Sequence, residues 1–191
     1  MPERHLLDVL KHVHHWVPYT RHFGPPSGSD PKLSDSVRRY LFTVFGFGCI
    51  LGASETARHA RENINRHSLH RINAQHVDAD KLEAAIADIV NQYRRFELPG
   101  CWGSEKVVIA DGTQMELREN NLLGERHIRY GGFGGIAYHH ISATYIALFS
   151  KFIACGVWEA VYILDALLEQ GSEMEPDIIH ADTQGQSEPV F

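Results

Sequence analysis

The class of fold is decided by the stretch KVVIADG at residues 106–112. Its run of apolar residues is long enough for a buried strand, and the Asp-Gly pair that follows is a frequent turn signal. We therefore expect a strand that ends at Asp111. The stretch DIIHAD at residues 177–182 repeats this pattern, so it predicts a second short buried strand that ends at Asp182.

The segment between these two strands predicts the rest of a sheet. Residues 126–142 and 144–153 have the composition of strands, and residues 157–170 form a helix that is apolar on most of its circumference. The order strand, strand, strand, helix, strand predicts a mixed α/β domain in which the helix returns the last strand parallel to the first. The glycine cluster at residues 131–135 matches no phosphate-binding pattern, so we expect a flexible hairpin connection there.

The part of the chain before residue 99 is predicted to be helical. Helices are expected from Leu6 to Val17, from Ser34 onward, from Ser54 to about Asn63, and from Asp78 to Phe96. We therefore expect two domains, a helical region at residues 1–98 and a mixed α/β domain at residues 99–191.

The composition excludes several classes of protein. The 191 residues are 43% hydrophobic and 22% charged, which excludes a disordered chain. The longest apolar run, residues 41–53, is shorter than the roughly 20 residues of a membrane span. Three cysteines without a CxxC spacing favour neither a disulfide scaffold nor a zinc site, and no secretory signal follows Met1, so we expect a cytoplasmic protein.

The net charge of −6 hides an uneven distribution. Residues 1–110 carry 14 Lys and Arg against 12 Asp and Glu, whereas residues 111–191 carry 4 against 12. The basic side chains of the first part could follow a DNA backbone, although exposed helices commonly carry arginines that only face solvent. The candidates for DNA contact are Arg58, Arg61, Arg66, Arg71, Arg94 and Arg95.

Asp111 and Asp182 are the candidate catalytic and metal-binding residues. If their strands are parallel neighbours about 4.8 Å apart, the two carboxylates meet over one site. Hard oxygen ligands suit Mg²⁺ or Mn²⁺, and two such ions would support an in-line phosphoryl transfer on a polynucleotide. The structural alternative is that Asp111 starts a turn and that Asp182 caps a helix or forms an Asx-turn.

Several ordered motifs together resemble the transposases of the Tn-three type, which are DDE enzymes of replicative class II bacterial transposons. The resemblance is strongest from about Leu98 to Phe191 and extends less distinctly back to about Leu6. Its motifs are WG at 102–103, ADG at 110–112, HIRYGG at 127–132, AYHHIS at 137–142, YILDALL at 162–168 and HADTQG at 180–185.

The resemblance implies a partial RNase H-like core with a three-stranded antiparallel meander, a crossover helix and a parallel strand, truncated before the last strand and helix. It makes Asp111 the first and Asp182 the second of three acids that hold two Mg²⁺ or Mn²⁺ ions. It also implies cleavage of the 3′ ends of transposon inverted repeats and their transfer into target DNA. The expected partners are DNA and either a second copy of this chain or a full-length transposase.

Two departures from the family's pattern bear on activity. The third acid, a glutamate on a later helix, falls beyond Phe191, and Glu188 lies too close to Asp182 to replace it. Ala143 stands where many members have an acidic residue. We therefore expect a transposase fragment that is inactive by itself. The alternative is a non-catalytic truncated transposase that binds DNA or the full-length enzyme as a regulator or remnant.

Overall fold

The computed structural model describes residues 3–29, 32–60, 64–117, 121–128, 131–169 and 171–182. The chain folds as two compact units, residues 1–89 and residues 90–191. Within the described ranges, no helix is both long enough and apolar enough to cross a membrane.

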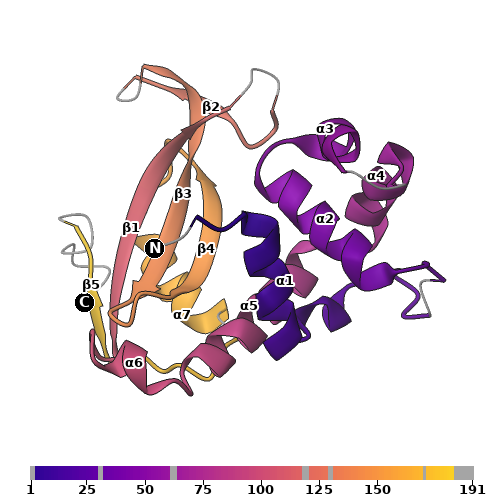
Figure 1. Ribbon diagram of the computed structural model, residues 1–191. Coiled ribbons are helices and arrows are strands. Elements are labelled where there is room, and N and C mark those ends of the chain that lie inside the picture. Colours follow the sequence, from indigo (N-terminus) through magenta and orange to yellow (C-terminus); the bar gives the residue numbers. More distant parts are fainter. Residues whose placement is uncertain are drawn as a thin grey trace. The chain divides into compact units, whose positions relative to one another are not determined.

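The first unit consists of helices (Figure 1). They are α1 (Leu6–Trp16), the 3₁₀ turn η1 (Tyr19–His22), α2 (Ser36–Gly48), α3 (Gly52–His59), α4 (Arg66–Gln75) and the larger part of α5 (Ala79–Tyr93). Their common core contains Tyr19, Tyr40 and Ile72, each with at most 3% of its surface exposed. The Tyr40 phenol and the Nδ1 atom of His76 share a buried 3.1 Å hydrogen bond, so the polar atoms inside this core are paired.

The boundaries of the helices differ from expectation in three places. The second helix begins at Ser36 rather than Ser34 and has no side-chain cap. The helix expected from Ser54 begins at Gly52 and ends at His59, and Asn63 lies outside the described residues. Helix α4 is not predicted by the sequence pattern, because only two of its ten residues are buried and the periodic signal is weak.

For α5 and the residues just after it, the sequence pattern predicts an apolar stripe of Leu82, Ile86, Ile89, Tyr93 and Phe96, and this prediction is only partly correct. Ala85 and Val90 are buried, whereas Leu82 and Ile86 keep 37% and 43% of their surface exposed. The buried side of the helix is therefore turned away from the predicted stripe and includes a small alanine that a hydrophobic pattern weights little.

The second unit holds the sheet. Its elements are α6 (Glu97–Gly100), β1 (Val107–Glu116), β2 (Glu125–His127), β3 (Gly132–Ser142), β4 (Ala147–Ala154), α7 (Val161–Glu169) and β5 (Ile178–His180). In Figure 1, β1, β3 and β4 lie side by side and β5 runs along β1. Strand β3 pairs antiparallel with β1, β2 and β4. Strand β1 pairs parallel with β5. The predicted mixed α/β class and the parallel return of the last strand are both confirmed.

Helix α7 covers one face of this sheet. Ile163 of α7 packs with Ala110, Ile136, Tyr138 and Ile153, which come from β1, β3 and β4. The helix begins four residues later than residue 157, where the sequence predicts its start. Because α7 buries one side of the strands, alternate strand residues face the other side.

The glycine cluster belongs largely to β3 rather than to a flexible connection. Gly131 has a positive φ of 70° and precedes the strand, whereas Gly134 and Gly135 lie inside it. A Cβ atom at Gly134 would lie 2.5 Å from the Met115 carbonyl oxygen, and one at Gly135 would collide with the ring of Phe152. These two glycines therefore allow a close approach of neighbouring strands, and the expected flexible hairpin at 131–135 is wrong for them.

Candidate catalytic site

Asp111 lies in the middle of β1 and not at its end. The strand continues to Glu116 because the backbone of the Asp-Gly pair joins the antiparallel ladder, Asp111 with His139 and Gly112 with Tyr138. The predicted end of the strand at Asp111 is therefore wrong, since the pairing outweighs the local turn preference of Asp-Gly. The Oδ1 atom of Asp111 accepts a hydrogen bond from the Gly112 N–H at 2.9 Å.

Asp182 follows β5 by two residues. The parallel pairing of β1 and β5 sets His180 beside Ile109. When this register is continued by two residues, Asp182 comes beside Asp111. The side chains of residues paired on neighbouring strands lie on the same side of a sheet. The register thus brings the two acids that the sequence predicts to neighbouring positions.

Both acids lie on the face of the sheet that α7 does not cover. Buried and exposed residues alternate along β1. Val108 and Ala110 have 0% and 3% of their surface exposed, whereas Ile109 and Asp111 are exposed. Asp182 is exposed as well. The two carboxylates are therefore open to an ion or to a polar substrate.

His139 and Ser150 continue a row of polar side chains across this face. His139 on β3 is the partner of Asp111, and Ser150 on β4 is the partner of His139. The Nδ1 atom of His139 lies 2.8 Å from the Ser150 hydroxyl, which fixes the ring and leaves Nε2 for a second partner. The row Asp182, Asp111, His139 and Ser150 therefore presents two carboxylates, an imidazole and a hydroxyl.

Tyr138 and Glu159 lie on the opposite, covered face. The Oε2 atom of Glu159, just before α7, would lie 2.5 Å from a Cβ atom at Gly112. Burial, followed by the negative charges of Glu159, Asp182 and Asp111, raises the pKa of Tyr138 to about 12. Three carboxylates thus act on one neutral phenol, which shows that negative charge is concentrated in this part of the sheet.

The acidic pair fits a divalent cation in part. Neighbouring carboxylates repel each other unless a cation lies between them, and their hard oxygens suit Mg²⁺ or Mn²⁺. Among the residues that the structure describes, however, no group of three or more His, Cys, Asp or Glu side chains is arranged to hold a metal ion. The described part of the chain therefore offers two candidate ligands and no group of three.

Residues 8–191 match the family model for the Tn3 transposase DDE domain. The chain belongs to this family. Its relatives include the transposases for transposon Tn2501 of Escherichia coli (28% identical over 193 residues), transposon Tn1546 of Enterococcus faecium (24% over 192) and transposon gamma-delta of Escherichia coli strain K12 (25% over 193). Each comparison covers 100% of this chain and 19% of the relative. This Tn3-family chain therefore spans about a fifth of the length of these transposases.

Two of the candidate arginines of this Tn3-family chain are engaged in ion pairs. The guanidinium of Arg94 donates hydrogen bonds of 2.8 and 3.2 Å to the two carboxylate oxygens of Glu105, and this pairing raises the pKa of Arg94. Arg58 pairs with Glu55 at 3.0 Å on the surface of α3. These guanidinium groups are partly neutralised within the fold, so they are weaker candidates for phosphate contact.

The other candidate arginines differ in their surroundings. Arg95 donates a 3.4 Å hydrogen bond to the side-chain oxygen of Gln92. Arg66 and Arg71 lie exposed on α4. Arg61 lies outside the described residues, as do Glu188, residues 129–130 of the motif HIRYGG and residues 183–185 of the motif HADTQG.

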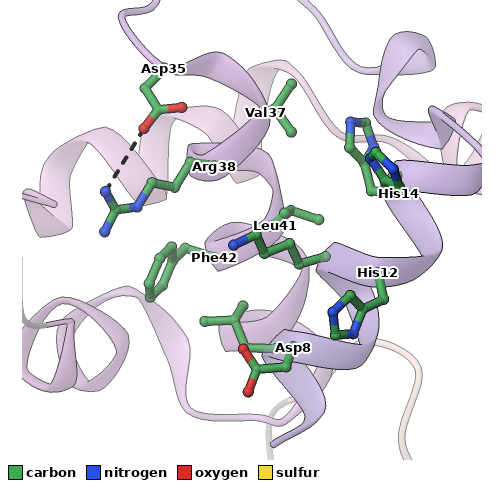
Figure 2. Close-up of a pocket in the computed structure, with 11 residues that line it drawn as sticks. Asp8, His12, His14, Asp35, Val37, Arg38, Leu41 and Phe42 are labelled. Carbon is green, nitrogen blue, oxygen red and sulfur yellow. Dashed lines mark ion pairs between the residues drawn. The ribbon is translucent and has the colours of Figure 1, made fainter.

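A separate hollow of about 800 Å³ lies between α1 and α2 of the first unit (Figure 2). Figure 2 shows the ion pair of Asp35 with Arg38, 3.9 Å long, on one side of Leu41, and His12 of α1 on the other. His14 also lines the hollow, and burial lowers its pKa. The described side chains here do not form a metal-binding group of three or more ligands.

The sequence pattern does not place His139, Ser150 or Glu159 near the two acids. His139 belongs to the motif AYHHIS, but its place beside Asp111 depends on the register of β1 with β3. The sequence does not specify this register because the connection between the two strands is long. Glu159 falls inside the helix predicted at residues 157–170, whereas it lies in the turn before α7. The alternation of exposed and buried residues in β3 would have found His139 once the register was known.

Proposed function

We propose that this chain supplies the first two catalytic acids, Asp111 and Asp182, of a metal-dependent transposase that cleaves the 3′ ends of a transposon and joins them to target DNA. Membership of the Tn3 transposase DDE domain family supports the reaction. The observation that carries the proposal is the parallel register of β1 and β5, which, when continued two residues past His180, supports neighbouring positions for the two acids.

The proposed roles of the side chains follow from their places on that face. Asp111 and Asp182 would hold Mg²⁺ or Mn²⁺ through their carboxylate oxygens, and the Gly112 N–H restrains the Asp111 carboxylate at 2.9 Å. Such an ion, when bound, activates the attacking oxygen and stabilises the leaving oxygen of a phosphoryl transfer. His139, oriented by Ser150, is placed to hydrogen-bond a phosphate oxygen of the DNA and so to position it beside the acids.

The arrangement of the strands supports an RNase H-like core. Strands β1, β3 and β4 form the antiparallel part of the sheet, α7 covers one face, and β5 pairs in parallel with β1. This is the part of the core that the resemblance implies before its last strand and helix. A helical region at residues 1–98 followed by a catalytic region at 99–191 completes the proposed organisation, with a cytoplasmic location and with DNA and further transposase copies as partners.

We further propose that residues 1–191 by themselves do not cleave DNA, because the resemblance places the third acid beyond Phe191. A second candidate function is that of a non-catalytic segment that binds DNA or a full-length transposase. It is favoured by the finding that the described residues contain no group of three metal ligands. The first candidate function requires a divalent metal ion bound at Asp111 and Asp182, whereas the second does not.

Binding of Mn²⁺ by the purified chain, measured by titration calorimetry, tests the metal site. Asp111→Asn and Asp182→Asn each remove one charged ligand, so each is expected to weaken Mn²⁺ binding by roughly tenfold or more. Asp177→Asn is the matched control, because Asp177 also lies beside β5 but forms an ion pair of 2.6 Å with Lys106. The control should bind Mn²⁺ as the parent chain does.

Two results would decide against parts of this proposal. Equal Mn²⁺ affinity in the parent chain and in Asp111→Asn would remove the metal site and favour the non-catalytic segment. Metal-dependent nicking of transposon-end DNA by residues 1–191, lost in Asp111→Ala, would confirm the catalytic role but contradict the inactivity of the isolated chain.

A further inference from the structure

Helix α4 carries one exposed face of arginine and histidine side chains. Helical geometry, about 100° per residue, places these four residues within roughly 140° of the circumference: Arg66, His67, His70 and Arg71. We call this surface the α4 face. The opposite side of the helix is buried through Leu69 and Ile72, which have 0% of their surface exposed. The buried side anchors the helix and leaves the α4 face open to solvent.

The positive charge of the α4 face is not neutralised within its own helix. Helix α4 contains no Asp or Glu, and in the described ranges neither Arg66 nor Arg71 forms an ion pair with a carboxylate. The guanidinium of Arg66 instead lies 3.4 Å from the ring of its neighbour His67.

Two other arginines of the first unit are paired with carboxylates. Arg21 pairs with Asp88 at 2.9 Å, and Arg58 pairs with Glu55 at 3.0 Å. Their charge is compensated by a carboxylate from the same unit. Among the described residues, Arg66 and Arg71 therefore carry charge that no carboxylate compensates, in contrast to Arg21 and Arg58.

We propose that the α4 face binds the phosphate backbone of duplex DNA. The inference rests on the proposed function in that it takes DNA to be the partner of this chain. Guanidinium groups match phosphate oxygens in charge and in bidentate geometry, and the imidazole N–H groups of His67 and His70 add donors on the same side. Contacts of this kind position a duplex without reading its bases. Binding through the α4 face is therefore independent of DNA sequence.

Fluorescence anisotropy of a short labelled duplex of arbitrary sequence, measured in EDTA, tests this inference. The variant Arg66→Gln/Arg71→Gln keeps good helix formers and is expected to bind about tenfold more weakly than the parent chain, with a salt dependence of log K that is shallower by about 2. Arg66→Lys/Arg71→Lys keeps the charge and is expected to retain most of the affinity.

The matched control is Arg21→Gln/Arg58→Gln, which removes two charges of the same kind that are already paired. Its affinity should stay within about twofold of the parent chain. An equal loss in the control and in the α4 variant would overturn the inference, because net charge alone would then account for binding. No binding of the duplex by the parent chain would overturn it too. Circular dichroism of each variant confirms that α4 and the other helices remain folded.

A failure here is distinguishable from a failure of the metal site. EDTA removes divalent ions, so the anisotropy reports duplex binding without any metal ion at Asp111 and Asp182. A duplex affinity that falls in the α4 variant while its Mn²⁺ affinity stays that of the parent chain would support the α4 face independently of the metal site. Anionic phosphatidylglycerol vesicles that compete fully with the duplex for the α4 face would instead identify a membrane surface and overturn the assignment to DNA.

Discussion

His140 is a buried histidine that the fold keeps neutral. It has 2% of its surface exposed, and neither of its ring nitrogens has a hydrogen-bond partner in the part of the chain that the structure describes. Its ring packs edge-on against Tyr138 and Phe149, with centroid distances of 5.3 and 5.9 Å. Burial, followed by the charge of His139, lowers the pKa of His140 to about 4.

This buried imidazole makes the second unit sensitive to acid. The unfolded chain takes up a proton at His140 near pH 6.5, whereas the folded chain does so only near pH 4. The free energy of unfolding should therefore be unaffected by this group above pH 6.5 and fall by roughly 3 kcal/mol as the pH drops from 6.5 to 4. Urea denaturation at a series of pH values measures this loss.

Two variants test whether His140 causes this pH dependence of the unfolding free energy. His140→Leu should flatten the profile between pH 6.5 and 4, whereas His70→Ala, at an exposed position on α4, should keep the slope of the parent chain. A parent profile that shows no slope in this range would contradict a neutral buried His140.

Gly112 is required by its neighbours on the covered face. A Cβ atom there would lie 2.5 Å from the Oε2 atom of Glu159 and 2.7 Å from the Cγ2 atom of Ile136, which is 2% exposed and cannot easily move. Gly112→Ala is expected to lower the free energy of unfolding by about 1–3 kcal/mol, measured by urea denaturation. Gly132→Ala has open space around the added methyl group, and a similar loss in that control would contradict the steric cause.

At the scale of elements, α7 is held on the sheet by more than its apolar side. Lys151 of β4 lies 2.5 Å from Asp165 and 3.0 Å from Glu169, two carboxylates one turn apart on α7. These contacts raise the pKa of Lys151. Its ammonium also lies 5.5 Å from the centre of the Tyr162 ring. One cation thus screens two acids that would otherwise repel each other along the helix.

Removal of this cation should loosen α7. Lys151→Met keeps the aliphatic stem and is expected to cost about 1 kcal/mol of unfolding free energy at low salt, with a smaller cost in molar NaCl. Chemical denaturation at both salt concentrations measures the difference. Lys106→Met removes a cation from the fully exposed pair with Asp177, and it should change stability less than Lys151→Met does. The reverse order would contradict this account of α7.

The elements also show what the sequence could and could not predict. The buried strand around residue 108, the helix before β5 and the parallel return of β5 were predictable, because each has a strong apolar pattern and a fixed handedness of connection. The position of Asp111 inside β1 was not, since Asp-Gly favours a turn until a partner strand pairs with it. Helix α4 was missed because Leu69 and Ile72 alone give no clear period.

At the scale of the whole chain, the acidic pair lies beside exposed apolar residues. Ile109 and Ile141 are paired across β1 and β3 and expose 48% and 41% of their surface, and Ile178 on β5 exposes 50%. Such a surface next to a short edge strand favours contact with another chain. The structure thus offers a physical reason to expect self-association, in line with the second copy of this chain that the resemblance implies as a partner.

Sedimentation velocity over a range of protein concentrations tests this expectation. The parent chain should show a sedimentation coefficient that rises with concentration, and Ile109→Lys/Ile141→Lys should reduce that rise because charges oppose the contact. Leu168→Lys, at a residue of α7 that is 86% exposed, is the control and should leave the rise unchanged. A parent chain that stays monomeric at every concentration would contradict the prediction.

The pairing of β1 with β5 determines at which stage of folding the two acids can become neighbours. Asp111 and Asp182 are far apart in the chain, and their strands come together through only three register pairs, which close the long segment between them. Closing such a loop is entropically costly, and a short pairing at the edge of a sheet forms late and opens early. A cation held by both carboxylates would also hold β5 against β1. Ion binding and the docking of the last strand are then one linked equilibrium, in which the ion completes the fold of the site that receives it.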